Sequence, residues 1–140
     1  MALRRTITAR KLVGAKKRAT SRAARFPKEV TGAVHAAQSK KASDVVVLDL
    51  RKAGGFTDYF VICTGGSGRQ IQAIADAVKE SLKKDFGERP ILAEGIEKSE
   101  WILLDYFDFV VHIFSVDCRA FYGLERLWGN AERHEFAAPA

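Results

Sequence analysis

Residues 57–76, TDYFVICTGGSGRQIQAIAD, contain the strand-to-helix transition that decides the fold of this 140-residue chain. The run 59–64 is apolar almost throughout, which is typical of a central β-strand covered on both faces. From Ser67 onward, apolar residues recur at steps of three and four, which predicts an amphipathic helix that ends at Gly87. Ser67 is a suitable N-cap for this helix. The glycines between strand and helix either cradle a phosphate group or only let the helix begin close to the sheet.

The flanking segments predict an α/β domain around this transition. Apolar periodicity, alternation and turn residues indicate further elements on both sides. They are a helix in 28–44, a strand 45–50, a short edge strand within 89–96, strands 101–107 and 109–115 joined by a tight hairpin around Asp108, and a last helix 116–128. The fold class is therefore α/β, with a mixed five-stranded sheet and flanking helices. Residues 130–140 show no clear element, and we expect a C-terminal tail there.

The charge of the chain is divided unevenly. The net charge is +6, but residues 1–28 hold ten of the 23 Lys and Arg and none of the 17 Asp and Glu. The remaining 112 residues therefore carry a net charge of −4. A basic N-terminal arm, which we expect to be disordered, precedes a mildly acidic body. Such a body suits a basic protein partner better than it suits nucleic acid.

Three interpretations of the arm stay open. It is a solvated tail without a role, a segment that contacts RNA phosphates, or an organelle transit segment, which would also be Arg-rich and free of acids. The candidate RNA-contacting residues of the arm are Arg4, Arg5, Arg10, Lys11, Lys16, Lys17 and Arg18.

Two bulk features limit the compartment and the class of protein. No run of 18 apolar residues occurs, so no membrane-spanning helix is predicted. Cys63 and Cys118 lie far apart and form no C-x-x-C motif, which argues against a disulfide framework and against a zinc module.

The glycine corner does not match the known phosphate-binding motifs. Ile71 stands where a dinucleotide fingerprint needs its last glycine, and no lysine follows as in a P-loop. The nearest arrangement is that of nucleotidyltransferases, in which Gly-Ser opens a helix and a D-x-D pair holds the metal ions. Here Gly66-Ser67 is present, but the next acid, Asp76, is alone. We therefore predict no enzyme activity, no metal and no cofactor, and we assign the glycines to helix geometry.

The three histidines offer no alternative chemistry, because none is placed at metal-ligand spacing from another. His112 is expected to be a polar residue on one face of the sheet, since its neighbours in the strand point the other way. A Cys–His dyad of His112 with Cys63 or Cys118 is the alternative.

The alternation of residues 101–105 gives a positive signal for an interface. Trp101, Leu103 and Asp105 share one face of the strand, and Ile102 and Leu104 share the other. If helices cover only the second face, the first presents an aromatic residue and an acid to solvent, which suits contact with a basic partner. The alternative is that Trp101 packs under a neighbouring loop.

Three separated segments resemble the ribosomal silencing factor family, also called Iojap-like. They are residues 57–76, EGIEKSEWILLDYFDFVVHIF (94–114) and RAFYGLERLWG (119–129), and the similarity runs in order from about residue 42 to residue 129. The resemblance implies a nucleotidyltransferase-like fold that lacks the catalytic carboxylates, in a domain of residues 29–129. It also implies a homodimer in the free state.

The resemblance further implies a function. Members of the family bind ribosomal protein fourteen of the large ribosomal subunit, block joining of the small subunit sterically and repress translation. The alternatives are a large-subunit assembly factor that uses the same surface, and an active nucleotidyltransferase. The arm of residues 1–28 extends beyond the usual start of the family. We expect a cytoplasmic bacterial protein, with import into an organelle as the alternative.

The resemblance and the strand pattern together give the candidate site residues. The expected contacts to the ribosomal protein are Glu100, Trp101, Leu103, Asp105, Asp108, His112 and the turn Phe56-Thr57-Asp58. Thr57-Asp58 could instead close a turn onto the backbone. Phe121, Leu124 and Leu127 are expected in the core by helical spacing, and Tyr122 and Trp128 in the dimer contact or the core.

Overall fold

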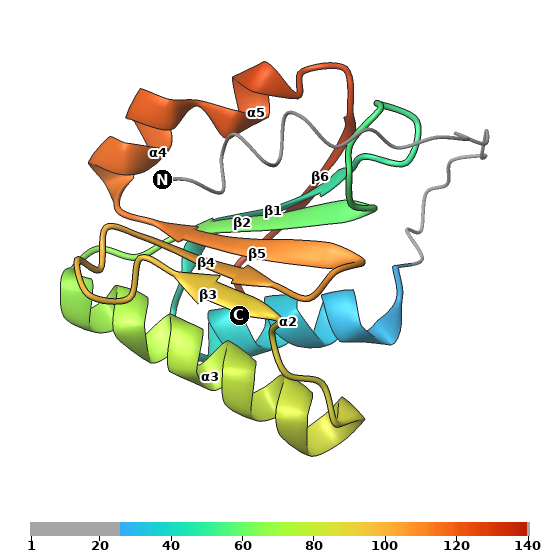
Figure 1. Cartoon of the computed structure of the whole chain (residues 1–140). Coiled ribbons are helices and arrows are strands. Elements are labelled where there is room, and N and C mark those ends of the chain that lie inside the picture. Colours follow the sequence, from blue (N-terminus) through green and yellow to red (C-terminus); the bar gives the residue numbers. More distant parts are fainter. Residues whose placement is uncertain (1–25, 140) are drawn as a thin grey trace.

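The computed structural model describes residues 26–139, and the predictions made for residues 1–25 lie outside this range. The described chain has three layers: α2 and α3 cover one face of a six-stranded sheet, and α4 and α5 cover the other (Figure 1). The helices are α2 (Lys28–Ser39), α3 (Gly68–Phe86), α4 (Val116–Tyr122) and α5 (Leu124–Leu127). The strands are β1 (Ser43–Asp49), β2 (Tyr59–Thr64), β3 (Leu92–Glu94), β4 (Trp101–Asp105), β5 (Phe109–Phe114) and β6 (Glu132–Phe136).

The sheet is mixed, as predicted, with the strand order β3-β4-β5-β2-β1-β6. The central strands β2 and β5 run parallel, and every other neighbouring pair is antiparallel. All residues of β2 and of β5 are buried, which confirms that the apolar run 59–64 is a central strand. The hairpin around Asp108 and the edge position of the strand within 89–96 are also confirmed.

The prediction of five strands is wrong by one. Residues 132–136, in the segment expected to be a tail, form β6 and pair antiparallel with β1, where His134 lies opposite Val47. The sequence of β6, ERHEF, has one strongly apolar residue, because a strand at the sheet edge exposes alternate side chains to solvent. Its signal therefore resembled that of a polar tail.

Helix α3 begins and ends where the sequence indicated. The Ser67 hydroxyl accepts a hydrogen bond from the Gln70 backbone N–H at 3.1 Å, and Gly87 is the C-cap. The last predicted helix, in contrast, is broken. Gly123 adopts a left-handed conformation (φ 53°), which ends α4 and starts the short α5 in another direction.

This break overturns the predicted core face of the last helix. A single helix would have placed Phe121, Leu124 and Leu127 on one side. Because the chain turns at Gly123, Leu124 is buried but Phe121 and Leu127 are exposed.

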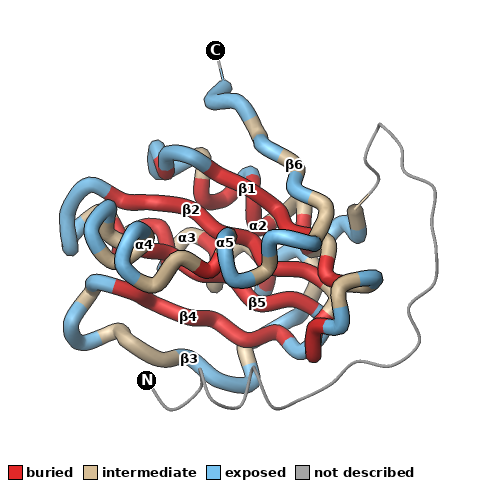
Figure 2. The backbone as a smooth tube through the Cα atoms, turned by 90° about the horizontal axis from the view of Figure 1, so that it is seen from above, coloured by how far each residue is buried: buried red, intermediate tan, exposed pale blue. Residues whose placement is uncertain are grey.

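The strand side chains alternate between two apolar clusters. Figure 2 shows β2, β4 and β5 as buried strands in the middle of the described chain. Ile102 and Leu104 belong to the larger cluster, beneath α2 and α3, as the alternation predicted. Trp101 and Leu103 belong to the second cluster, which α4 and α5 help to cover. Both sheet faces are therefore part of the core. Among residues 26–139, no helix is long and apolar enough to cross a membrane.

Gly95, in the turn that leads from β3 to β4, generates a test of the fold. It has a φ of 83°, and a Cβ there would overlap the carbonyl oxygen of Trp101. Gly54 has a similar φ of 81°, but a Cβ added to it would meet no atom within 4 Å. Gly54→Ala should lower the free energy of unfolding by about 1 kcal/mol for the left-handed backbone, and Gly95→Ala by about 2 kcal/mol more for the overlap. Urea unfolding of both variants measures the difference, and equal losses would contradict the close approach of this turn to β4.

Candidate functional site

A buried Trp–His pair lies at the centre of the second cluster. The Trp101 Nε1–H donates a hydrogen bond to His112 Nδ1 at 3.0 Å. His112 stands between Ile62 of β2 and Leu103 of β4 in the sheet register. The ring of Phe60 lies edge-on to His112, with 4.5 Å between ring centroids. The polar pair is therefore enclosed by apolar and aromatic side chains.

His112 is neutral in this environment. Burial lowers its pKa to about 3, because the apolar surroundings disfavour the charged ring. Since Nδ1 accepts the hydrogen bond from Trp101, the ring proton is on Nε2. That nitrogen has no hydrogen-bond partner among the described residues, and neither does the nearby Trp128 Nε1. His112 has no geometry for acid–base catalysis.

The alternative of a Cys–His dyad is wrong, because neither ring nitrogen of His112 is bonded to a cysteine. The only side-chain hydrogen bond of His112 in residues 26–139 is to Trp101. Cys63 belongs to the other cluster, across the sheet, and burial raises the pKa of its thiol to about 12. A thiol with such a pKa is not a nucleophile near neutral pH.

The expectation that Trp101, Leu103 and Asp105 face solvent is also wrong. Trp101 is 6% exposed and Leu103 is fully buried. The ring of Tyr122, on α4, packs on Trp101 with 4.6 Å between centroids. The expectation required helices on one face alone, whereas α4 and α5 lie over the other. Asp105 accepts a hydrogen bond from the backbone N–H of Phe107 at 2.8 Å and thereby closes the β4–β5 turn.

Helices α4 and α5 expose three large apolar side chains, of which Val116 also borders the pocket beside Arg119. We call Val116, Phe121 and Leu127 the α4–α5 face; their exposed fractions are 63%, 77% and 59%. Asp117 lies one helical turn before Phe121, on the same side of α4. Glu100 is adjacent, because its carbonyl oxygen accepts the Ser115 N–H at the start of α4. The result is an apolar face with acids at its rim.

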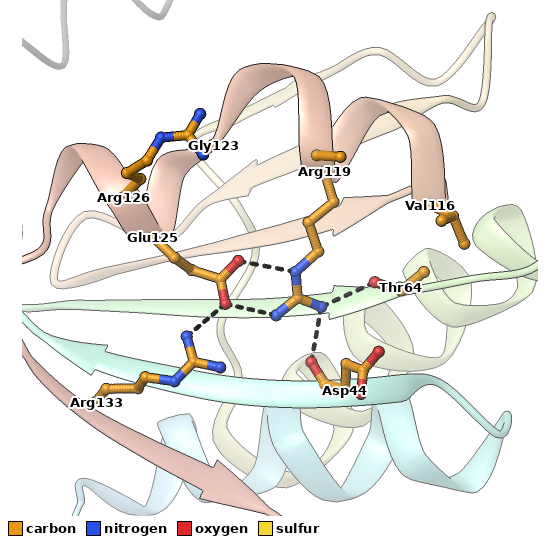
Figure 3. A pocket seen from close by; sticks show the side chains of 9 residues that line it. Asp44, Thr64, Val116, Arg119, Gly123, Glu125, Arg126 and Arg133 are labelled. Carbon is orange, nitrogen blue, oxygen red and sulfur yellow. Dashed lines mark hydrogen bonds and ion pairs between the residues drawn. The ribbon is translucent and has the colours of Figure 1, made fainter.

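Arg119 attaches α4 to the sheet (Figure 3). Its guanidinium donates to the Asp44 carbonyl oxygen at 2.7 Å and to the Thr64 hydroxyl at 2.8 Å. The same group binds both carboxylate oxygens of Glu125, at 3.0 and 2.8 Å. Arg133 of β6 binds Glu125 from the other side at 2.7 Å. One network thus connects α4, α5 and β6 with the ends of β1 and β2.

The network lines an open pocket of about 390 Å³. Its charged groups largely bind one another, since Arg119 and Arg133 both bind Glu125 and lower the pKa of that carboxyl. Arg126 also lines the pocket, but its guanidinium points away from Glu125 in Figure 3. We therefore interpret the pocket as a structural junction. The sequence did not predict the network of Arg119 and Glu125, because their partners Asp44, Thr64 and Arg133 are distant in the chain.

A second group of predicted residues meets at the β4–β5 turn. Thr57 donates its hydroxyl to the carbonyl oxygen of Phe107 at 2.7 Å, so it closes onto the backbone. The Asp58 N–H donates to the carbonyl oxygen of Asp108 at 3.0 Å. Partial burial raises the pKa of the Asp58 carboxyl, and the nearby Asp108 carboxylate raises it further. This corner is therefore acidic.

The glycine corner is held by a side chain of the protein itself. Gln70 accepts the Gly66 N–H at 2.6 Å through Oε1 and donates Nε2–H to the carbonyl oxygens of Lys40 and Lys41 at 2.9 and 3.1 Å. A Cβ on Gly65 would meet the Ile71 side chain, which explains the need for glycine. Among residues 26–139, no three His, Cys, Asp or Glu side chains are grouped as metal ligands would be. The corner sets the start of α3.

The predicted contact residues do not form one continuous surface in this structure. Glu100 and Trp101 lie at one end of β4, and Asp105, Asp108 and the turn 56–58 at the other. Leu103 and His112 are buried between them. Tyr122 and Trp128 pack partly buried against the second cluster. Sequence reasoning missed the exposed Val116 and the Arg119 network, and it placed the exposed Leu127 in the core.

Comparison with known proteins adds to this geometry. A family model described as "Ribosomal silencing factor during starvation" matches residues 23–139. The chain is 44% identical over 99 residues to the ribosomal silencing factor of Halalkalibacterium halodurans, which covers 71% of this chain and 84% of that protein. It is 42% identical over 97 residues to the chloroplastic protein Iojap of Zea mays, which covers 69% of this chain and 41% of that protein.

Two solved structures share the fold. A crystal structure from Bacillus halodurans superposes with a TM-score of 0.68 at 38% identity, and the match covers 78% of this chain and 98% of that one. A crystal structure from Chromobacterium violaceum superposes with a TM-score of 0.70 at 33% identity, and covers 83% and 96%.

The burial of His112 predicts a pH dependence of stability. Its pKa is about 3 in the folded chain and near 6.5 when exposed. The unfolded chain therefore binds the extra proton between these values, and the stabilisation that is complete above pH 6.5 is lost as the pH falls. Below pH 6.5 this residue should lower the free energy of unfolding by up to about 1.4 kcal/mol per pH unit.

Urea unfolding at pH 7, 6 and 5 tests this expectation. The slope should be smaller in His112→Gln, whose side chain retains an acceptor for Trp101. His35→Gln, on the exposed side of α2, is the control and should keep the parent slope. An unchanged slope in His112→Gln would contradict the assignment.

The Arg119 network predicts unequal costs for two arginines that share Glu125. The Arg119 side chain is 13% exposed and that of Arg133 is 44% exposed. Arg119→Ala should lower the free energy of unfolding by about 2 kcal/mol, because the part-buried Thr64 hydroxyl and Glu125 carboxylate lose their donor. Arg133→Ala should cost less than about 1 kcal/mol. Thermal and urea unfolding of the two variants measure these costs, and similar values would show that Arg119 does not anchor α4.

Proposed function

This chain belongs to the family of ribosomal silencing factors, and on that premise we propose that it binds ribosomal protein fourteen of the large subunit and keeps the small subunit from joining. Translation is repressed by occupancy: a folded domain on a surface that the small subunit needs excludes that subunit. Such a mechanism requires a binding face and no reaction. The observation that carries the proposal is the α4–α5 face, where exposed apolar side chains stand beside acids on a body of net charge −4.

The composition of this face suits a basic protein. Phe121 is the largest exposed anchor, and aromatic anchors dominate the energy of protein interfaces. Asp117 and Glu100 at the rim favour approach of Lys and Arg, which aids the association rate and the orientation more than the affinity. Exposed apolar side chains gathered on one helical layer favour an interaction site there, in a domain whose other apolar residues are mostly buried.

The buried members of the predicted site support the face from beneath. Trp101 contacts Tyr122 on α4, and His112 fixes the Trp101 ring through its hydrogen bond. We propose that Trp101, Leu103 and His112 contribute to binding by positioning α4. Asp105 and Asp108 contribute to binding at the far end of β4. Replacing Trp101 would disturb the fold and the binding together, so it is a poor test of the contact.

The same face suits a second copy of the chain in the free protein. Exposed apolar area is costly in water, and a symmetric dimer would cover it when no ribosome is present. We propose that the homodimer and the ribosomal complex use this face in turn. For the location we propose the bacterial cytoplasm, with an organelle as the alternative because a relative is the chloroplastic protein Iojap.

Phe121→Asp provides the test of the proposed contact. Purified protein is sedimented with isolated large subunits, and small subunits are then added. The parent should migrate with the large subunit and reduce joined ribosomes. Phe121→Asp should weaken binding by about 10-fold or more, because an anchor residue contributes about 2 kcal/mol or more. Since Phe121 is 77% exposed, the stability of the fold should be unchanged.

Ile91→Asp is the matched control, because Ile91 is a similarly exposed apolar residue, 67% exposed, outside the α4–α5 face. It should bind as the parent does. If the parent itself stays at the top of the gradient, the ribosomal function is wrong. If both variants bind normally, the function stands and the α4–α5 face is not the contact.

A further inference from the structure

The pocket of the Arg119 network opens beside the α4–α5 face. Val116 belongs to both, because it is one of the exposed apolar residues of the face and also lines the pocket. Ala120 and Gly123, on the same helical layer, line the pocket as well. A partner that covers the α4–α5 face therefore comes to lie beside this open pocket.

The charges that line the pocket are positive on balance. Both Arg119 and Arg133 bind the Glu125 carboxylate, so two positive charges share one negative charge. Glu135 also binds Arg133, at 3.2 Å, but it is 71% exposed and lies outside the pocket lining, so water weakens this pair. The charged residues of the lining are three arginines and two acids, a net charge of +1. They are Arg119, Arg126, Arg133, Asp44 and Glu125.

Arg126 is the cation of this pocket without a partner in the described chain. Its guanidinium makes no hydrogen bond or ion pair with any of residues 26–139. It lies against the break between α4 and α5, because a Cβ on Gly123 would overlap the Arg126 Nη2. Figure 3 shows the Arg126 side chain beside Gly123 and directed away from Glu125. Its N–H donors are therefore available to a group that arrives from outside.

A guanidinium in this position suits a phosphate group. It is planar, stays charged at physiological pH and can donate two parallel hydrogen bonds to the oxygens of a phosphate or of a carboxylate. The proposed partner is a basic protein, in which carboxylates are few. The RNA on which such a protein sits carries a phosphate at every nucleotide. Phosphate is therefore the anion that Arg126 meets most readily on a ribosomal subunit.

The charges of the helical layer are also separated along the chain. Asp117 lies in the first turn of α4, and Glu100 is bonded to the start of that helix through its carbonyl oxygen. Arg126 lies in α5, after the turn at Gly123. The acidic end suits a basic protein, and the arginine end suits the RNA beside that protein. One layer thus has a suitable charge for each component of a ribosomal subunit.

We propose that Arg126 binds a phosphate group of ribosomal RNA when the α4–α5 face is bound to the large subunit. The guanidinium donates to the phosphate oxygens, and the net positive charge of the pocket lining supports the contact. This inference rests on the proposed function, because the RNA comes with the large subunit. The contact adds a salt-dependent part to the affinity.

The salt dependence of binding tests this contact. Binding of the full chain to isolated large subunits is measured between about 50 and 200 mM KCl at constant Mg²⁺. Arg126→Gln should weaken binding by about threefold or more at the lower salt concentration. It should also reduce the slope of the logarithm of affinity against the logarithm of salt concentration by about one, because one phosphate contact is lost.

Arg69→Gln is the matched control. Arg69 is exposed at the start of α3, on the opposite face of the sheet, and its replacement removes the same charge from the chain. This variant should keep the affinity and the salt slope of the parent. Since Arg126 is exposed too, thermal unfolding of both variants should match that of the parent.

Isolated ribosomal protein fourteen distinguishes RNA from protein as the source of the bound group. Arg126→Gln should bind the isolated protein as the parent does, because no phosphate is present. Phe121→Asp should weaken binding to the isolated protein and to the large subunit alike. Equal weakening of Arg126→Gln with both probes would mean that the pocket binds a carboxylate of the protein, and would overturn the proposal.

Two further outcomes would overturn it. If the parent binds the large subunit and Arg126→Gln keeps its affinity and slope, the phosphate contact is wrong and the proposed function stands. If Arg126→Gln and Arg69→Gln lose affinity equally, only the net charge of the chain matters. When the parent itself does not bind large subunits, the proposed function is wrong and this contact is wrong with it.

Discussion

The hydrogen bond from Trp101 to His112 is the interaction on which the α4–α5 layer depends. It puts a polar pair inside an aromatic cluster, where an unpaired indole N–H would cost about 1–3 kcal/mol. The bond requires a neutral imidazole, and the surrounding apolar side chains enforce that state. With the Trp101 ring fixed, Tyr122 has a defined surface to pack on, and the short α4, which has no fully buried residue of its own, gains a position. The outward direction of Phe121 follows from this arrangement.

The sequence predicted the elements whose signals are local. The transition from β2 to α3 was clear because an apolar run, a serine cap and a helical period follow one another within 57–76. The hairpin around Asp108 was equally clear. Sequence reasoning could not show whether helices cover one face of the sheet or both. Exposure of Trp101 was inferred from alternation, but alternation gives only the face and does not say what covers it. The polar strand β6 was missed because its partner, β1, defines it more than its own residues do.

At the candidate site, too, the sequence predicted the local features and missed those that distant residues form together. The family resemblance rests on motifs that each lie within one stretch of chain, and the comparisons confirm it. The residues that organise the surface are spread over the chain: Arg119 binds atoms of Asp44, Thr64 and Glu125. No spacing rule joins such positions. At the glycine corner the start of α3 at Ser67 could be predicted from the sequence, whereas the role of Gln70 in closing the corner needed coordinates.

The strand order has a consequence for the newly made chain. β2 pairs with β5, where Tyr59 lies opposite Phe109, and β1 pairs with β6, where Val47 lies opposite His134. Both pairings join distant positions, and domains rich in such contacts fold slowly because long loops must close before the contacts form. The edge of β1 stays open during synthesis until residues 132–136 have left the ribosome and can pair with it. In that interval the apolar edge of β1 is where a nascent chain would need a chaperone most.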